Sequence, residues 1–183
     1  MDRNRALEEL MLRIENQNLL KHSFAVEAIM RKCASHFHDD PDLWGIAGLV
    51  HDIDLERVNY DMSVHGMMGG DILEALDFDK TIVYAVRAHN PNNQYERRRK
   101  IDKALYCAEA LSELITACAL AAPGKKLGNV DVPFVLEKFE NRSFAKEVNR
   151  EQIASCLELG LSLEQMVALS LEAMKEISDV LEL

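Results

Sequence analysis

Apolar residues recur every three or four positions along almost the whole chain, a spacing that predicts amphipathic helices. No segment of convincing length alternates between apolar and polar residues, as a half-buried β-strand would. The spacing predicts helices at about residues 6–14, 20–37, 42–51, 63–76, 80–89 and 98–120, with smaller ones beyond. The third of these contains WGIAGLV, which is apolar nearly all round and should lie at the centre, with Pro41 in its first turn. We therefore expect an all-α fold.

The length of the chain is that of one domain. Its 183 residues, 48% of them hydrophobic, are enough to enclose a core. We expect a single domain over residues 1–183, with a core at about 18–120 and a C-terminal helical extension at 121–183. The cap signals in the extension are Asn149 with Gln152 and Ser162 with Gln165, both spaced like capping boxes, and Gly160 at a helix C-terminus.

Composition limits the expected location and partners. No stretch approaches the roughly twenty uncharged apolar residues of a membrane span, and the charged N-terminus lacks the apolar core of a signal peptide. The four cysteines are scattered in apolar helical contexts, which favours reduced thiols and a cytoplasmic protein. A net charge of −10 argues against a nucleic-acid polymer as partner and leaves a small phosphorylated substrate, held by metal ions or a local basic patch. The first and last helices are candidate surfaces of a homodimer or, equally, parts of the core.

Four of the six histidines lie at predicted helix ends or in unusual local contexts. They are His22 near the start of the second helix, His51 beside Asp52 at the end of the third, His65 in the glycine-rich SVHGMMGGDIL, and His89 at the end of the fifth. Helix ends that meet around one pocket can bring these imidazoles and the carboxylate together. Nitrogen and carboxylate ligands without thiolates suit divalent iron, manganese, zinc, nickel or magnesium, and not a cysteine-rich structural zinc site. The sequence thus predicts a site for divalent metal ions.

A second His-Asp pair occurs at His38-Asp39, in the segment CASHFHDD. It lies in a polar stretch before Pro41, so we interpret it, together with His36, as solvated surface or a helix cap. The dipeptide alone does not separate the two copies. Their contexts do, because the pair at His51 follows an apolar helix.

Five segments, taken in order, resemble the HD-domain superfamily: KHSFAVEAIM, GIAGLVHDID, VHGMMGGDIL, AVRAHN and IDKALYCAEAL. The similarity is closest to the HDIG-type branch, whose motif order is H…HD…H…H…D, and it covers about residues 18–115. The tail, KFENRSFAKEVNREQIASCLELGLSLEQMV, resembles the C-terminal region of uncharacterised bacterial HD-domain hydrolases. The resemblance implies an all-helical core and a metal-dependent phosphohydrolase.

The same resemblance implies a ligand role for each of the matched residues. It makes His22, His51 and Asp52 ligands of a first metal ion. His65 and His89 match the extra histidines that hold a second ion in the branch with binuclear sites, where Asp52 would bridge the two ions. We therefore expect two divalent ions.

The chain departs from the family pattern at two positions. The last ligand of the family is an aspartate in a segment like LYCADAL, whereas this chain has Glu109 in LYCAEAL. Glutamate is one methylene longer and can still ligate if its helix lies slightly further back. Asp102, two turns earlier on nearly the same helix face, is the alternative, and we favour Glu109. The glycine of the HDIG motif is replaced by Asp54.

Acidic and basic residues near these motifs are candidates for catalysis and substrate binding. Two metal ions can clamp the attacking and leaving oxygens of a phosphate ester and lower the pKa of bound water. We expect Asp52 and Asp54 to be the catalytic carboxylates; Asp54 and Asp61 either orient imidazoles, act as a base or are solvated loop acids. The basic run ERRRKIDK follows the His89 loop and either receives phosphates or is a solvated face. The expected substrate-binding residues are Lys21, Arg97, Arg98 and Lys103.

Three functions are compatible with these features. The first is metal-dependent hydrolysis of a nucleotide or another small phosphate ester by metal-activated water. The second is oxidation of a substrate at a di-iron site, since the same histidines would serve it. The third is a non-catalytic protein, in which Glu109 marks a decayed site kept for binding a ligand or partner. We favour the phosphohydrolase.

Overall fold

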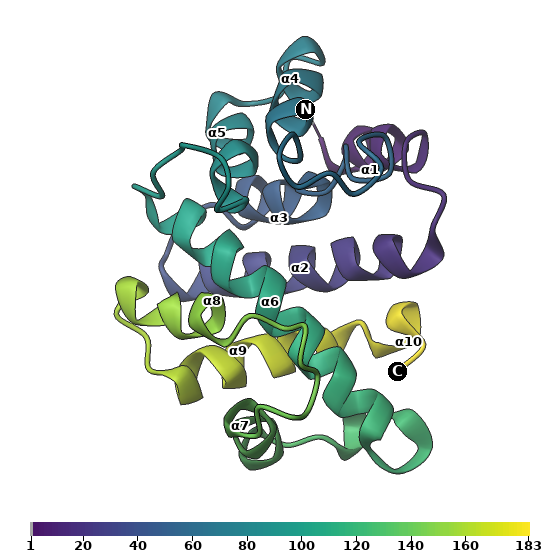
Figure 1. The fold of residues 1–183 in the computed structure, drawn as a ribbon, viewed down its shortest axis with the longest axis vertical. Helices are drawn as coiled ribbons and strands as arrows, with labels where there is room; N and C mark the ends of the chain where they lie inside the picture. Colours follow the sequence, from purple (N-terminus) through teal and green to yellow (C-terminus); the bar gives the residue numbers. More distant parts are fainter. Residues whose placement is uncertain (1) are drawn as a thin grey trace.

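The computed structural model describes residues 2–183, which form helices joined by turns and contain no β-strand. This confirms the expected all-α fold (Figure 1). The α-helices are α1 (Arg3–Met11), α2 (Gln17–His36), α3 (Pro41–Val50), α4 (Met67–Ala75), α5 (Lys80–His89), α6 (Lys100–Ala121), α7 (Val132–Glu140), α8 (Arg150–Ala154), α9 (Leu163–Glu176) and α10 (Ser178–Leu181). Short 3-10 helices lie at Pro123–Lys125, Leu127–Asn129 and Ser155–Leu159.

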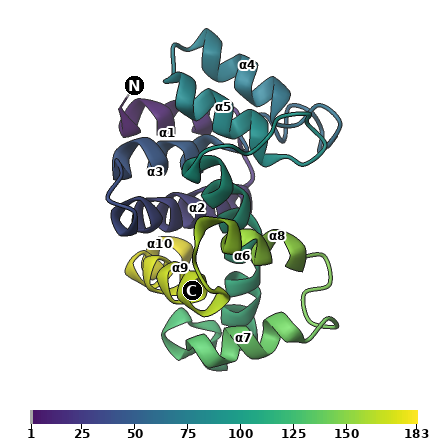
Figure 2. The same ribbon diagram turned by 90° about the vertical axis from the view of Figure 1, so that its left-hand side faces the viewer.

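Helix α2 lies at the middle of the molecule, with α3 packed on one side and α9 on the other (Figures 1 and 2). Every residue of α3 from Trp44 to Val50 is buried, which confirms the central place expected from its composition. The two helices approach closely at Gly48, where a Cβ atom would lie 2.9 Å from the carbonyl oxygen of Val26. This close packing brings the end of α3 against α2, and with it the residues that follow Val50.

Most helix ends fall where the cap residues predict them. Asp40 accepts hydrogen bonds from the first backbone N–H groups of α3, and Pro41 occupies its first turn. Gly160 adopts a left-handed φ of 78° after the 3-10 helix that ends at Leu159. Ser162 and Gln165 form the reciprocal capping box of α9.

Several predicted boundaries are wrong. Helices α1 and α2 each begin three residues before the expected start, at Arg3 and Gln17. The first helix ends at Met11, three residues early, although Ile14 is buried against the core as its spacing predicts. The fourth begins at Met67 and not at residue 63, because Gly66 has a φ of 79°, a left-handed conformation that interrupts a helix. Residues 51–65 instead form mostly successive turns, so the side chains of this segment do not follow the regular spacing of a helix.

The predicted capping box at Asn149 and Gln152 is only half formed. Asn149 accepts a hydrogen bond from the backbone N–H of Gln152, as a cap residue should. The side chain of Gln152 does not return to the cap; its amide reaches across to α6.

Helix α6 connects the two parts of the molecule. It packs against α2 and α5 on one side and against α7, α8 and α9 of the extension on the other (Figure 1). By length and composition it could cross a membrane, but 61% of its most apolar window is buried inside the molecule, as in a core helix. The free cysteines Cys33, Cys107, Cys118 and Cys156 are all buried, as expected for reduced core thiols.

Candidate metal centre

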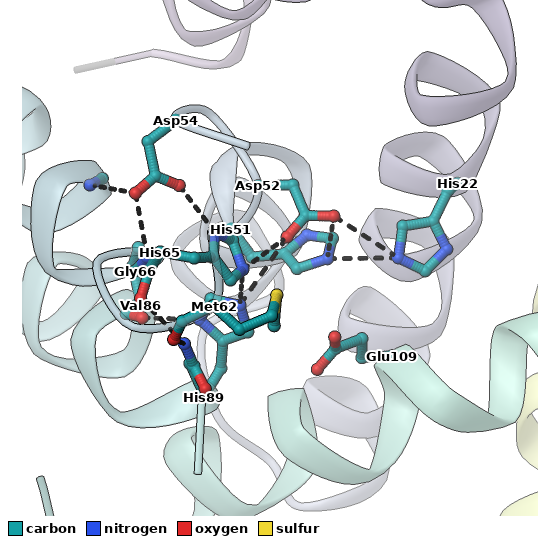
Figure 3. A network of polar contacts seen from close by, with 12 residues as sticks. His22, His51, Asp52, Asp54, Met62, His65, Gly66, Val86, His89 and Glu109 are labelled. Atoms are coloured by element: carbon teal, nitrogen blue, oxygen red, sulfur yellow. Dashed lines mark hydrogen bonds and ion pairs between the residues drawn. The ribbon is translucent and has the colours of Figure 1, made fainter. Parts of the chain in front are cut away.

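Four imidazoles from different elements meet around one carboxylate (Figure 3). His22 comes from α2, His51 is the residue that follows α3, and His65 lies just before α4. His89 is the last residue of α5. All but His22 are almost completely buried; the side chain of His22 is 17% exposed. The structure therefore brings together the four histidines that the sequence singled out.

Asp52 lies at the centre of the four rings. Its Oδ2 atom is 3.3 Å from His51 Nε2 and 3.8 Å from His22 Nε2. Its Oδ1 atom is 3.2 Å from His65 Nε2 and 3.6 Å from His89 Nε2. The residues thus form two groups, His22-His51-Asp52 and Asp52-His65-His89, whose ligand atoms lie within 4.8 Å of one another in each group. Both groups share Asp52.

The far side of each ring is held by a hydrogen-bond acceptor. Nδ1 of His51 donates to the Gly48 carbonyl at 2.8 Å, and Nδ1 of His89 donates to the Val86 carbonyl. Nδ1 of His65 donates to Asp54 Oδ1 at 2.8 Å. Nδ1 of His22 lies 3.2 Å from Ser112 Oγ, whose own hydroxyl donates to the Glu109 carbonyl. These partners favour a proton on Nδ1, so that in the neutral form of each ring the Nε2 lone pair is directed at Asp52.

The donor set fits divalent cations. Nε2 of His22 lies 3.2 Å from Nε2 of His51, and the corresponding atoms of His65 and His89 are 3.0 Å apart. Two lone pairs at such distances repel each other unless a proton or a metal ion lies between them. Asp52 Oδ1 is buried and, among residues 2–183, has no hydrogen-bond partner of good geometry. A cation shared by these groups would satisfy all of them at once.

The protonation of the rings reflects the same crowding. Burial lowers the pKa of His22 to about 4, and the neighbouring His51 adds to this effect. Burial alone would also lower the pKa of His65, but the nearby carboxylates of Asp52 and Asp54 outweigh burial and raise it to about 10. Burial alone would raise the pKa of Asp52. The nearby imidazoles, of which His51 has the largest effect, outweigh burial and hold this pKa well below its ordinary value.

Asp54 lies behind His65, fully buried. Besides the ring of His65, its carboxylate accepts the backbone N–H groups of Gly66 at 2.8 Å and Gly69 at 2.7 Å. A carboxylate with these three donors orients the imidazole, which is one of the three alternatives that the sequence left open for it. Asp61 is different: it is exposed and accepts from the N–H and hydroxyl of Ser63, as a solvated loop acid does.

The structure separates the two candidate acids on α6. Figure 3 shows Glu109 below Asp52 with its carboxylate turned toward the cluster, although it lies outside the two 4.8 Å groups. Asp102 is fully buried at the start of α6, where it accepts the backbone N–H groups of Arg98 and Arg99 and pairs with the Arg99 guanidinium at 2.7 Å. Asp102 is therefore a helix cap.

A cavity of about 840 Å³ adjoins the centre, and His22, Asp52, His65 and Glu109 are among the residues that line it. Lys21 also lines it and forms an ion pair with Glu182. Much of the remaining wall is apolar: Leu19, Leu55, Met62, Ala117, Leu120 and Leu181.

The three other predicted substrate-binding residues do not line this cavity. Arg97 lies over the ring of Tyr106, with its guanidinium carbon 3.8 Å from the ring centre. Arg98 pairs with Glu96, and Lys103 pairs with Glu158. Arg99, in the same run, is the N-cap residue of α6, so the basic run makes local contacts.

Sequence reasoning missed several contributors. Glu113 lines the cavity four residues after Glu109; burial, with repulsion from Glu109, raises its pKa to about 7. The i,i+4 spacing of the two acids could have indicated it. Asn90 and Asn93 both donate to the carbonyl of His65, from the segment NPNNQYE, whose composition indicates only a loop. Ser112, beside His22, carries no sequence signal at all.

Comparison with known proteins agrees with this geometry. The family model described as HD domain matches residues 19–120. Ribonuclease Y of Fusobacterium nucleatum is 26% identical over 171 residues, which are 91% of this chain and 33% of that protein. Ribonuclease Y of Clostridium tetani and that of Clostridium novyi are each 27% identical over 146 residues, 74% of this chain and 26% and 27% of those proteins. The chain thus spans about a third or less of these relatives, and no solved structure matches it.

These relatives correct one expectation and confirm two others. The exclusion of a nucleic-acid polymer as partner is wrong, because the relatives are named as ribonucleases, which act on RNA. Net charge was a poor guide to nucleic-acid binding. It governs non-specific binding over a whole surface, whereas metal ions can supply positive charge locally at a site. The expected enzyme class, a metal-dependent phosphohydrolase, and the resemblance to the HD-domain superfamily are confirmed. The chain belongs to the HD-domain family.

Proposed function

We propose that this chain hydrolyses phosphoester bonds of ribonucleotides, including those within RNA, at the four-histidine centre around Asp52. One observation carries the proposal: four Nε2 lone pairs, each fixed from behind by an acceptor at Nδ1, converge on one buried carboxylate. Divalent ions held there would polarise a phosphoryl oxygen and lower the pKa of water, which is the chemistry that phosphoester hydrolysis needs. The names of the relatives support a ribonucleotide as the substrate class.

We assign the ligands to two ions. His22, His51 and Asp52, with Glu109 completing the set, would hold one ion. Asp52, His65 and His89 would hold the other, so that Asp52 bridges them. The assignment rests on the two ligand groups and on their shared residue.

Residues of the chain other than the ligands have separate tasks in this proposal. Asp54 keeps the proton of His65 on Nδ1, so that Nε2 stays available to a cation. Lys21, beside His22 on the cavity wall, would meet a substrate phosphate once it leaves Glu182. Tyr60 and Met62, both partly exposed on the cavity wall, offer an apolar and aromatic face to a nucleobase. The buried free thiols support a reducing compartment such as the cytoplasm.

Activity assays on the metal-loaded protein test the proposed reaction. The substrates are a labelled single-stranded oligoribonucleotide and ribonucleoside monophosphates, assayed separately with manganese, iron, nickel, zinc and magnesium. We expect cleavage that falls at least about a hundredfold in His51→Ala and in Asp52→Ala. The matched control is His38→Ala combined with Asp39→Ala, which removes the exposed His-Asp pair. A wild type no faster than His51→Ala on every substrate would overturn the proposal, and stoichiometric metal without turnover would favour the non-catalytic function.

Metal titration tests the number of ions. We expect wild type to bind two ions at saturation, and His65→Ala and His89→Ala each to lose about one and keep the other. The readout is metal content by mass spectrometry after removal of free ions. A wild type that saturates at one ion would refute the bridged pair and leave His65 and His89 as substrate contacts.

A further inference from the structure

Gln152 connects the C-terminal extension to the metal centre. It lies in α8, beyond residues 19–120 that match the family model, and only 8% of it is exposed. Its Nε2 group donates to the Glu109 carboxylate at 2.9 Å and to the Tyr106 carbonyl at 2.8 Å. Both hydrogens of the amide therefore point at acceptors on α6, which fixes its orientation.

Glu109 needs such a partner. Its side chain is long, only partly buried and turned toward a cavity that also contains the carboxylates of Asp52 and Glu113. Like charges repel, and Glu113 lines the same cavity four residues after Glu109 on α6. Without a fixed donor, rotation about its three side-chain torsions would let Glu109 move away from the histidines.

The chemistry of the partner also matters. A lysine or arginine in this place would neutralise the carboxylate and compete with a metal ion for it. The neutral amide of Gln152 holds Oε2 of Glu109 and leaves the full negative charge on the acid. A donor of this kind is what a metal-binding carboxylate requires on its far side.

We propose that Gln152 is a positioning residue that holds Glu109 toward the His22-His51-Asp52 group, so that the extension completes the metal centre. The inference rests on the proposed function only in taking that group to bind a divalent ion. The extension then contributes a positioning residue to the site, besides packing against α6. Glu147, Leu181 and Glu182, which also line the cavity, come from the same part of the chain.

The chain offers a closely matched control. Gln152 and Gln165 both occupy the third position of a helix in the extension. The side chain of Gln165 accepts a hydrogen bond from the backbone N–H of Ser162 at the cap of α9, whereas the side chain of Gln152 donates to Glu109. Methionine resembles glutamine in shape and lacks the donor, so Gln152→Met and Gln165→Met remove comparable groups. Gln152→Ala serves as the second variant if Gln152→Met fails to fold.

The measurement is the dissociation constant for manganese, determined by calorimetry on the full chain without substrate. We expect Gln152→Met to weaken the binding of one ion by about 10- to 100-fold. Gln165→Met should leave both dissociation constants unchanged. Unchanged or tighter binding in Gln152→Met would overturn the inference while leaving the proposed function in place. A wild type that binds no ion would overturn both.

A double-mutant cycle separates positioning from a general structural effect. If Gln152 acts through Glu109, then adding Gln152→Met to Glu109→Gln should cause no further loss of manganese affinity. An equal loss in the presence and absence of the Glu109 carboxylate would show that Gln152 merely stabilises the fold, and would overturn the inference.

Discussion

Two of the four imidazoles are placed by the same local geometry. His51 follows the last residue of α3, and His89 is the last residue of α5. Each donates from Nδ1 to the carbonyl three residues earlier, that of Gly48 or of Val86. The last carbonyls of a helix have no partner within it, so a histidine there gains an acceptor without disturbing the helix. This explains why a histidine can stand where a buried helix ends.

His65 makes the metal-free protein sensitive to alkaline pH. Its pKa is about 10 in the folded protein against an ordinary value of 6.5, so its contribution to stability is complete below pH 6.5 and is lost as the pH rises to about 10. With a chelator present, we expect the free energy of unfolding to fall between about pH 7.5 and 9.5, by at most about 1.4 kcal/mol per pH unit. Denaturant titrations at several pH values measure it.

Asp54→Asn provides the comparison for this prediction. It removes one of the two carboxylates that raise the pKa of His65, so the decline with pH should become shallower. A wild-type stability that stays flat over this range would show that His65 is neutral in the metal-free protein.

At the scale of elements, α6 carries two acids with different tasks. Asp102 caps the start of the helix, and Glu109 faces the metal centre two turns later. Nearly the same helix face serves both, yet only Glu109 lies where α6 passes the cavity. The helix thus supplies part of the core, one wall of the cavity and one candidate ligand.

The two acids should respond differently to removal. Asp102→Ala leaves the N–H groups of Arg98 and Arg99 and a guanidinium without their acceptor, and should lower the free energy of unfolding by about 1–3 kcal/mol. Its metal content should equal that of wild type, whereas Glu109→Ala should bind one ion less tightly. Chemical denaturation and metal analysis of the two purified variants check this. Loss of metal in Asp102→Ala alone would reverse the assignment.

At the scale of the whole molecule, the metal centre joins elements that are far apart in sequence. Its candidate ligands come from α2, the segment after α3, the turn before α4, the end of α5, and α6 (Figures 1 and 3). An ion that binds only the folded state stabilises it by mass action, by about 2.7 kcal/mol at a free concentration a hundred times the dissociation constant.

Chelation should therefore lower the melting temperature. For a chain of this size we expect a decrease of roughly 5–10 °C on addition of excess chelator, measured by circular dichroism. His38→Ala should behave like wild type, because His38 is exposed and belongs to neither ligand group. His51→Ala should already melt low and respond little to the chelator. Equal loss of metal in both variants would mean that the wrong His-Asp pair was chosen.

The amino-acid sequence by itself determined the helical class, most helix ends and the choice between the two His-Asp pairs. These are local properties: apolar spacing sets the buried face of α3, Pro41 marks its first turn, and the apolar run before His51 marks that pair as buried. Three of the four histidines were identifiable for the same reason, since His51, His65 and His89 stand at or beside a helix end, whereas His22 lies in the second turn of α2.

Only the tertiary structure decided which acids and bases belong to the site. Asp102 and Glu109 share nearly one helix face, and only the path of α6 past the cavity separates the cap from the candidate ligand. The path of the chain likewise directs Arg97 onto Tyr106, and Gln152 away from its own cap toward Glu109. Such contacts join residues up to 43 positions apart, and the spacing of apolar residues along a helix carries no information about them. They depend on how closely the helices cross, as α2 and α3 do at Gly48.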